Sequence, residues 1–320
     1  MLMKLIPNFK GFDFFPHNTR LPFMRYKDTA IMLSVAAMLA SLALIAVKGL
    51  NYGVDFKGGS MIELQSTSGP ANVAAIRDKL HGIVAGTPQI QEVGGSNTVL
   101  IRIEEQPGGD AAQQEALKKV KAAVGEGYTE RRVEVVGPAV SSELRTTGFI
   151  AVAASILAIV TYVWFRFEWQ FAVGAIVALV HDVLVTAGIF SFFQLEFDLS
   201  IVAALLTILG YSVNDTVVVS DRIREILRKF KKMELNQLLN NSINETLSRT
   251  FMTGLTATVV LVALYIFGGE VIRNFNLAML IGIVIGTYSS IFIAAPLLAY
   301  LGVKRDWSDQ AAKGATPAKA

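Results

Sequence analysis

Six apolar stretches, separated by short charged segments, constrain this chain more than any other feature of its sequence. A helix needs about 20 mostly apolar residues to cross a bilayer, and each stretch is long enough. Charged residues make up only 17% of the 320 residues, below the roughly 25% typical of a soluble domain. We therefore predict a polytopic α-helical membrane protein. Its six spans are predicted at residues 30–47, 148–165, 171–193, 199–220, 250–268 and 276–301.

The placement of basic residues predicts the orientation. Short cytoplasmic loops carry an excess of Lys and Arg, and long translocated domains are not counted. The segment 221–249 holds seven basic residues and the first 28 residues hold five, whereas the short loops near 194–198 and 269–274 contain Arg273 alone. We expect both termini in the cytoplasm and the long insert after the first span in the periplasm. No small-residue cleavage site precedes Asn51, so a signal peptide is the weaker interpretation of the first stretch.

The insert, residues 49–147, reads as a soluble domain of its own. Strand-like alternation and helical periodicity give the order βαββαβ, which is typical of a ferredoxin-like α+β domain. The strands are predicted at 60–65, 89–93, 98–103 and 131–136, and the helices at 72–84 and 111–124. A Gly94–Asn97 turn is predicted between the second and third strands. His81 has no Asp or Ser placed to make it a catalytic base.

The remaining segments complete the predicted organisation. Residues 1–28 form a cytoplasmic N-terminal segment, 29–48 the first helix, 148–301 the other five helices, and 302–320 a polar cytoplasmic tail. Within 221–249 an apolar stripe of Ile223, Ile226, Leu227 and Phe230 lies opposite basic residues, with a second helix plausible over 235–247. An interfacial helix on anionic lipid is the favoured interpretation. A docking site for a protein partner is the alternative.

Two polar residues stand inside the fourth span. Its eleven Leu, Ile and Val residues favour insertion by roughly 3–7 kcal/mol, and one central Asp costs about 2.5–3.5 kcal/mol. With Asn214 beside Asp215 the helix is only marginally insertable alone, so this face must contact protein or water. Intramembrane carboxylates are functional candidates by default. A structural role, accepting hydrogen bonds from Ser or Thr on a neighbouring helix, is the alternative.

Arg249 begins the fifth span on the same side as the end of the span that carries Asp215. Burial favours the neutral form of a carboxylate and a nearby arginine favours its ionised form, so such a pair can change charge when it moves apart. An arginine that only extends to the lipid headgroups is the alternative. His181 and Asp182 form a second polar pair, in the third span. Adjacent helical residues point about a hundred degrees apart, so we expect Asp182 either to take part in proton transfer or to tie helices together, with a lesser role for His181.

The sixth span contains Gly282 and Gly286, a GxxxG pattern that predicts close helix packing. Nucleotide-binding loops, HExxH and candidate hydrolase triads are absent from the sequence. We therefore expect no enzymatic activity, no cofactor, no metal and no nucleic-acid partner. Work done by such a chain would draw on an ion gradient, worth about 2.3 kcal/mol per charge per 100 mV, or on a partner.

Several motifs resemble the SecD/SecF family of protein translocase subunits, within the resistance-nodulation-division superfamily. GVDFKGG at 53–59 is similar to the sequence that opens the exported domain in this family. FDLSIVAALLTILGYSVNDTVVVSDRIRE at 197–225 and LSRT at 247–250 resemble its fourth and fifth helices. FGG at 267–269 and IGIVIGTYSSIFIAAPL at 281–297 match its sixth helix. The order of these motifs is that of the SecF branch, and the likeness covers nearly the whole chain.

The resemblance implies a role and partners that composition and spacing do not give. Six spans would be half of a twelve-span unit completed by SecD. The complex would associate with the SecYEG channel, and also with YajC and YidC. It would use the proton gradient to promote late-stage translocation and release of secreted polypeptides after the ATPase SecA has acted. Carried over by position, the proton-sensitive carboxylate is Asp215 and the essential arginine is Arg249. From their polar side chains inside the spans, we expect Asn214 and Asp182 to be further members of a proton pathway.

The family motif residues Gly53, Asp55, Phe56, Gly58 and Gly59 carry no assigned chemistry, and we expect their glycines to shape the joint between helix and domain. Membrane lipids are the remaining expected partner. Two other functions stay open: half of a proton-driven transporter for small molecules or lipids, and a passive scaffold of the translocon. A transporter half would need a larger exported region lined by aromatic side chains. A scaffold would tolerate Asp215→Asn without consequence.

Overall fold

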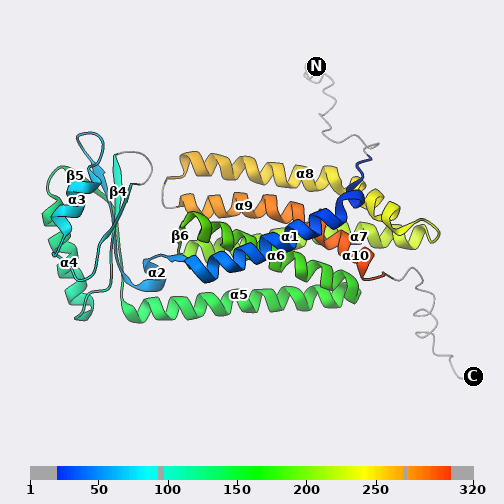
Figure 1. Cartoon of the computed structure of the whole chain (residues 1–320), viewed down its shortest axis with the longest axis horizontal. Coiled ribbons are helices and arrows are strands. Elements are labelled where there is room, and N and C mark those ends of the chain that lie inside the picture. The colour runs from blue at the N-terminus through cyan, green and yellow to red at the C-terminus, as the bar shows by residue number, and fades with distance from the viewer. Residues whose placement is uncertain (1–19, 93–96, 270–271, 304–320) are drawn as a thin grey trace, which may run out of the picture.

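The computed structural model describes residues 20–92, 97–269 and 272–303. It consists of a bundle of long helices with a small α/β domain at one end (Figure 1). Six helices are long and apolar enough to cross a membrane, which confirms the predicted fold class. They are α1 (Lys27–Lys48), α5 (Pro138–Arg166), α6 (Trp169–Phe193), α7 (Leu199–Lys229), α8 (Leu235–Phe267) and the segment Arg273–Tyr300. We call the two ends of the bundle the sheet end and the loop end, the latter carrying the α7–α8 connection.

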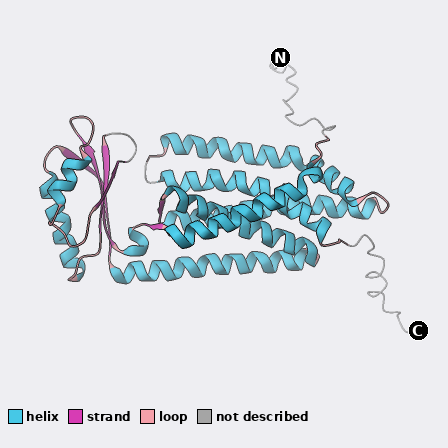
Figure 2. Cartoon of the chain, in the orientation of Figure 1, coloured by secondary structure: helices cyan, strands magenta, loops and turns pink. Residues whose placement is uncertain are grey.

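The sheet-end domain has four antiparallel strands in the order β3-β4-β2-β5, as the βαββαβ pattern predicts for a ferredoxin-like fold. Its elements are β2 (Gly59–Ser66), α3 (Val73–Leu80), β3 (Gln89–Glu92), β4 (Thr98–Ile103), α4 (Gly109–Val124) and β5 (Tyr128–Val136). Figure 2 shows the strands between the two helices and the bundle. Ile62, Ile101 and Ile103 are fully buried and pack in one core with Leu80 and Val120. The domain thus has its own hydrophobic core.

Two very short strands join this domain to the bundle. β1 (Asn51–Tyr52) follows α1 and pairs in parallel with β6 (Glu196–Phe197), which lies between α6 and α7. A single helical turn, α2 (Val54–Lys57), leads from β1 into β2. Neither strand has a sequence pattern, because two residues are too few for an alternation to register.

The helix that contains the predicted second span, residues 148–165, begins before that span. α5 begins at Pro138, only two residues after β5 ends. Proline is favoured in the first turn of a helix because its missing N–H is not needed there. The turns that follow Pro138 are polar, so hydropathy alone does not show where this helix begins.

The segment 221–249 is not a separate interfacial loop. α7 has 31 residues and α8 has 33, which at 1.5 Å per residue gives lengths of about 46 and 50 Å. Both helices are therefore longer than the bilayer hydrocarbon core, which is about 30 Å thick. Beyond it they form a helical hairpin in which Ile223 and Leu227 pack in one cluster with Leu238 and Ile243. This apolar stripe contacts protein, which corrects the expectation that it lies on lipid. Phe230, the last residue of the stripe, remains exposed.

The last span is not a regular helix. α9 (Arg273–Ser289) is followed by the π-helical turn η4 (Ser290–Ala294) and then α10 (Ala295–Tyr300). π-turns are rare and frequently occur at functional sites. Pro296, which lacks an N–H donor, follows the turn directly.

Part of the N-terminal segment docks onto the hairpin. A short 3₁₀ helix, η2 (Phe23–Tyr26), precedes α1. The Leu21 N–H donates to Asn244 Oδ1 at 2.8 Å and the Met24 N–H donates to Asn240 Oδ1 at 3.0 Å. Residues 1–19, most of the predicted Gly94–Asn97 turn and the tail from 304 lie outside the described residues.

Candidate functional site

Asp215 lies in α7 with its carboxylate turned into the bundle, and the residue is only 6% exposed. Both oxygens accept a hydrogen bond from a different helical segment. Thr250 Oγ1 of α8 donates to Oδ1 at 2.6 Å, and Ser290 Oγ of η4 donates to Oδ2 at 2.6 Å. Distances of about 2.5–2.7 Å are typical of hydroxyl groups that donate to an ionised carboxylate. Asp215 therefore holds three segments at one point.

Asp182 of α6 forms a second buried cluster and is completely inaccessible to solvent. Its Oδ2 accepts from Ser212 of α7 at 2.6 Å and from Ser289 of α9 at 2.8 Å. His181 Nδ1 lies 3.0 Å from Asp182 Oδ1. The two adjacent residues thus make a direct contact, although neighbouring helical positions point about a hundred degrees apart. Asp182 also ties α6, α7 and α9 together, as its alternative interpretation required.

The π-turn brings the two clusters together. Ser289 and Ser290 are consecutive, yet the first donates to Asp182 and the second donates to Asp215. On α7, Ser212 and Asp215 are three residues apart and lie on one helix face. The two carboxylates are thereby linked through α7 and through the junction of α9 and η4.

Arg249 and Asn214 lie outside this buried network. Arg249 precedes Thr250 on α8 and is exposed, lining a cleft of about 360 Å³ with Asp221, Arg222 and Glu245. It is near enough to attract the Asp215 carboxylate electrostatically, but no ion pair joins the two residues in the described structure. Asn214 is exposed on the outer surface of α7. Among the predicted proton-pathway residues, the structure buries only Asp215 and Asp182.

The hydroxyl donors are the part of the site that sequence reasoning missed. Four hydroxyl residues lie in the family motifs but had no predicted function: Ser212, Thr250, Ser289 and Ser290. The sequence does contain one signal for these donors. Ser212 and Asp215 share a face of one helix, and a buried carboxylate needs hydrogen-bond donors from neighbouring residues. The pair Gly282 and Gly286 provides the close packing that lets α9 approach. A Cβ at Gly282 would collide with Ile208, and one at Gly286 would lie 3.2 Å from Ser212 Cβ.

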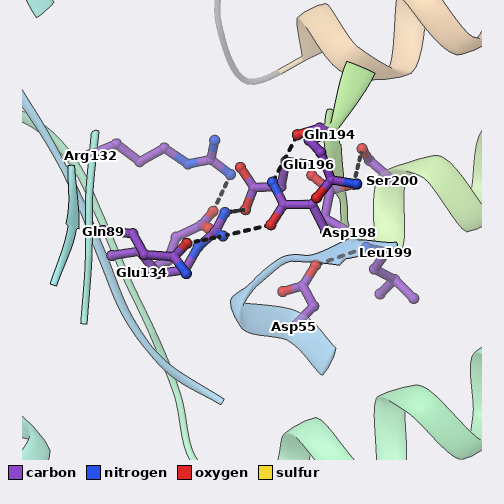
Figure 3. A network of polar contacts seen from close by, with 11 residues as sticks. Asp55, Gln89, Arg132, Glu134, Gln194, Glu196, Asp198, Leu199 and Ser200 are labelled. Carbon is purple, nitrogen blue, oxygen red and sulfur yellow. Dashed lines mark hydrogen bonds and ion pairs between the residues drawn. The ribbon is translucent and has the colours of Figure 1, made fainter. Parts of the chain in front are cut away.

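The GVDFKGG motif forms the joint between bundle and sheet domain. The Gly53 N–H donates to Phe197 O at 2.9 Å, and a Cβ at Gly53 would lie 2.9 Å from Glu196 Oε1. Asp55 Oδ2 accepts from the Leu199 N–H at the start of α7, at 2.9 Å (Figure 3). A carboxylate at a helix N-terminus is also favoured by the helix dipole. The ring of Phe56 is buried beside Phe197.

The next two glycines make the turn into the sheet. Gly58 and Gly59 have φ of 75° and 110°, a region that side chains disfavour, and a Cβ at Gly59 would collide with the Ile103 carbonyl oxygen. The motif thus connects α1, the β1–β6 pair, the start of α7 and the first strand of the sheet.

An ion pair completes the joint. Arg102 of β4 contacts Glu196 of β6 at 2.5 Å, with 8% and 16% of the two side chains exposed. Arg102 also donates to Gln89 Oε1 and to Asn51 Oδ1, and Asn51 Nδ2 donates to Gln194 O at 2.9 Å. Burial raises the pKa of Glu196 above its usual value, the positive charge of Arg102 opposes this, and Asp198 adds to it. Figure 3 shows Glu196 at the centre of this network.

The chemistry available at these sites is hydrogen bonding and charge change. Among the described residues, no group of three or more His, Asp or Glu side chains converges as a metal site requires. The bundle clusters contain carboxylates and one imidazole, which can gain or lose a proton, and hydroxyls, which donate or accept hydrogen bonds.

Comparison with known protein families matches most of the chain. Residues 116–304 match the family described as Protein export membrane protein SecD/SecF, C-terminal, and residues 43–69 match the SecD/SecF GG Motif. The second match covers the joint described above.

Individual relatives carry the names of the same family. The chain is 46% identical over 310 residues to Protein translocase subunit SecF of Cereibacter sphaeroides, covering 94% of this chain and 95% of the relative. It is 45% identical to Protein translocase subunit SecDF of Brucella abortus, covering 90% of this chain but only 38% of that longer protein.

A crystal structure of SecDF from Thermus thermophilus, described as a translocon-associated membrane protein, superposes with a TM-score of 0.81 at 36% identity. The match covers 89% of this chain and 39% of that one. Together with the six apolar helices, these findings identify a multi-pass inner-membrane protein. The chain belongs to the SecD/SecF family of protein export membrane proteins.

Proposed function

We propose that this chain promotes the late stage of protein export by coupling a change in the charge of Asp215 to movement of the sheet-end domain. The auxiliary role in the Sec machinery follows from membership of the SecD/SecF family and from relatives named as translocase subunits. The observation that carries the mechanism is the buried Asp215 carboxylate, held at both oxygens by Thr250 and Ser290.

The first step is at the carboxylate. An ionised Asp215 attracts both hydroxyl donors and, across one helical turn, the guanidinium of Arg249. A proton on Asp215 removes the charge and turns one oxygen into a donor, so one of the two hydroxyls must reverse or leave. α8 and η4, which carry those hydroxyls, are then held less tightly to α7.

The second step runs along α7. This helix carries Asp215 in its interior and begins at Leu199, whose N–H is bound by Asp55 of the joint. A displacement of α7 would move β6 with it, and β6 contacts the sheet through Glu196 and Arg102. α7 is thus a continuous element between the intramembrane clusters and the sheet-end domain.

The orientation and partners are part of the proposal. Both termini are cytoplasmic and the sheet-end domain is periplasmic, in accord with the seven basic residues of 221–249. SecD supplies the other half of the unit, which is supported by relatives that carry the SecD and SecF names on one chain. SecYEG, YajC and YidC are further proposed partners, and a translocating polypeptide is the proposed cargo. We assign the chain no enzymatic reaction and no cofactor.

Co-purification tests the assembly. Membranes that express a tagged chain are solubilised in mild detergent, and bound proteins are identified by mass spectrometry. A SecD-type protein and channel subunits should be recovered in near-stoichiometric amounts with both the wild type and Asp215→Asn, because the amide preserves the packing. Recovery of the tagged chain alone, under conditions where the channel itself stays intact, would contradict the proposed assembly.

A further inference from the structure

A basic cleft opens at the loop end of the bundle, away from both carboxylate clusters. It has a volume of about 490 Å³, within the range of about 300–1,000 Å³ common for small-molecule sites. Its lining contains four cations and two anions, a net charge of +2. These residues are Arg166 of α5 and Asp221, Arg224, Glu225, Arg228 and Lys229 of α7.

The charges are held in place by the fold. Arg166 contacts both oxygens of Asp221 at 2.9 Å. Arg224 contacts Glu168, in the turn between α5 and α6, at 2.9 Å. Arg228 and Lys229 are exposed at the end of α7. Because the opposite, apolar face of α7 is buried against α8, this basic face has a fixed position.

Aromatic side chains place the cleft at the depth of the lipid headgroups. Trp164 and Trp169 flank Arg166 in the sequence and are 55% and 51% exposed, and Phe165 between them is 86% exposed. Exposed Trp residues at the ends of spans are typical of the membrane–water interface. A basic cleft at that depth contacts lipid phosphate, and each Lys or Arg adds to the attraction of an anionic headgroup.

We propose that this cleft binds the headgroup of an anionic phospholipid. The phosphate lies among Arg166, Arg228 and Lys229, and the acyl chains extend past Trp164 and Phe165 along α5. Asp221 and Glu225 limit the charge of the site, so a single monoanionic headgroup is preferred over a multiply charged one. The site is independent of the charge change proposed for Asp215.

The chain offers its own optical probe for this test. It contains three tryptophans, Trp164, Trp169 and Trp307, so the full-length variant Trp307→Phe retains only the two that flank the cleft residue Arg166 in the sequence. This variant is placed in nanodiscs of phosphatidylcholine that contain a minor fraction of brominated phosphatidylglycerol or, in a parallel sample, of brominated phosphatidylcholine. Bromine quenches tryptophan on contact, so the ratio of the two quenching values reports lipid preference beside the cleft.

We expect brominated phosphatidylglycerol to quench more strongly. Adding Arg228→Gln and Lys229→Gln to the Trp307→Phe variant removes two of the cations that attract the headgroup and should bring the ratio of the two quenching values close to one. Lys231→Gln with Lys232→Gln is the matched control: it removes the same charge from the adjoining α7–α8 connection but leaves the cleft lining intact. That control should keep the preference.

Three results would overturn the proposal. The first is equal quenching by both lipids, which would show that the cleft does not prefer an anionic headgroup and would favour an acidic protein as its partner. The second is an equal loss of the phosphatidylglycerol preference in the cleft and control variants, which would show that the preference comes from general surface charge. The third is loss of the preference on adding inorganic phosphate at constant ionic strength, which would identify a free phosphate as the ligand.

Discussion

Arg102 of the sheet and Glu196 of the bundle form an ion pair, and most of both side chains is buried. The two residues lie in β4 and β6, far apart in the sequence. Removing one partner of a buried pair leaves an uncompensated charge and costs about 3 kcal/mol or more, whereas removing both costs less. The pair therefore fixes the position of the domain more than it adds stability.

This relationship predicts a rescue. Arg102→Gln leaves the Glu196 carboxylate without its cation, and should loosen the domain from the bundle by about 3 kcal/mol. Arg102→Gln with Glu196→Gln should recover most of that loss. The measurement is the distance distribution between spin labels on α4 and on the sheet end of α8. A double variant as broad as Arg102→Gln alone would contradict this account.

The joint should also respond to pH in the Arg102→Gln variant. Burial and Asp198 then raise the pKa of Glu196 without opposition, so the neutral form is favoured in the docked state. A raised pKa gives docking that is strongest below the ordinary value of 4.5 and is lost as pH rises through the raised value. The same spin-label distances, followed upward from pH 4, should broaden in Arg102→Gln. They should stay narrow when Glu196→Gln is added, because no group remains to titrate there.

The variants Gly59→Ala and Gly69→Ala together distinguish the cost of backbone strain from the cost of a steric collision. Both have positive φ, 110° and 115°, but a Cβ at Gly59 meets the Ile103 carbonyl while one at Gly69 has open space. Each Ala substitution costs about 1 kcal/mol for its backbone conformation, and Gly59→Ala adds the collision with β4. Thermal unfolding of residues 55–140, which we expect to fold as a separate domain around its own core, measures the difference. Equal destabilisation by the two variants would contradict the role assigned to Gly59.

Much of the architecture could be predicted from the sequence because its signals are local. A run of about 20 apolar residues marks a span, and alternation marks a strand long enough to show it, such as Ser60–Gln65. Helical structure after Asp221 was predicted, but not that it continues the apolar spans without a break, and the polar start of α5 at Pro138 has no hydropathy signal. The β1–β6 pair and the Arg102–Glu196 contact could not be predicted, because they depend on how the domain sits on the bundle.

The candidate site was predictable only in its charged members. Asp215 and Asp182 stood out because a bilayer penalises carboxylates. Their partners Ser212, Ser289 and Thr250 are common in membrane helices and become specific only through packing. No sequence pattern marks the π-turn. This turn directs Ser289 and Ser290 to different carboxylates.

These neighbouring serines offer a test of which carboxylate matters. A lost hydrogen bond to a buried charged group costs about 1.5–3 kcal/mol. Ser290→Ala removes a donor from Asp215 and should reduce proton-dependent release, while Ser289→Ala removes a donor from Asp182 and should mainly lower the melting temperature. Release and melting temperature are measured for both variants in the same strain. A larger release defect in Ser289→Ala would move the proton-sensitive group to Asp182.

The orientation has a direct test. A reporter fused at Gly109, at the start of α4, should be active only when exported, and one fused at Lys232, between α7 and α8, only in the cytoplasm. The expectation rests on the basic residues of 221–249 and on the positive-inside rule. The opposite pattern would reverse the proposed topology and with it the side from which protons reach Asp215.

The proton-coupling claim is tested by the double variant of Asp215 and Arg249. Asp215→Asn keeps the shape of the side chain and one acceptor oxygen but cannot change charge, and Arg249→Met removes the charge that responds to it. If the two residues act as one unit, the double variant should be no worse than the more severe single variant. Release rates of all three variants give the comparison. Additive defects would show that Arg249 acts elsewhere.

The most direct measurement is the release of a secreted protein from spheroplasts in the Asp215→Asn strain, with and without an uncoupler. Membrane insertion and recovery of the complex serve as controls, since the neutral amide should leave both intact. The account predicts slow release that the uncoupler no longer changes, because the titrating group is gone. Asp215→Glu, which keeps the charge on a longer side chain, should retain partial, uncoupler-sensitive release. Wild-type release in Asp215→Asn that remains sensitive to the uncoupler would contradict the central claim and place the proton-sensitive group elsewhere.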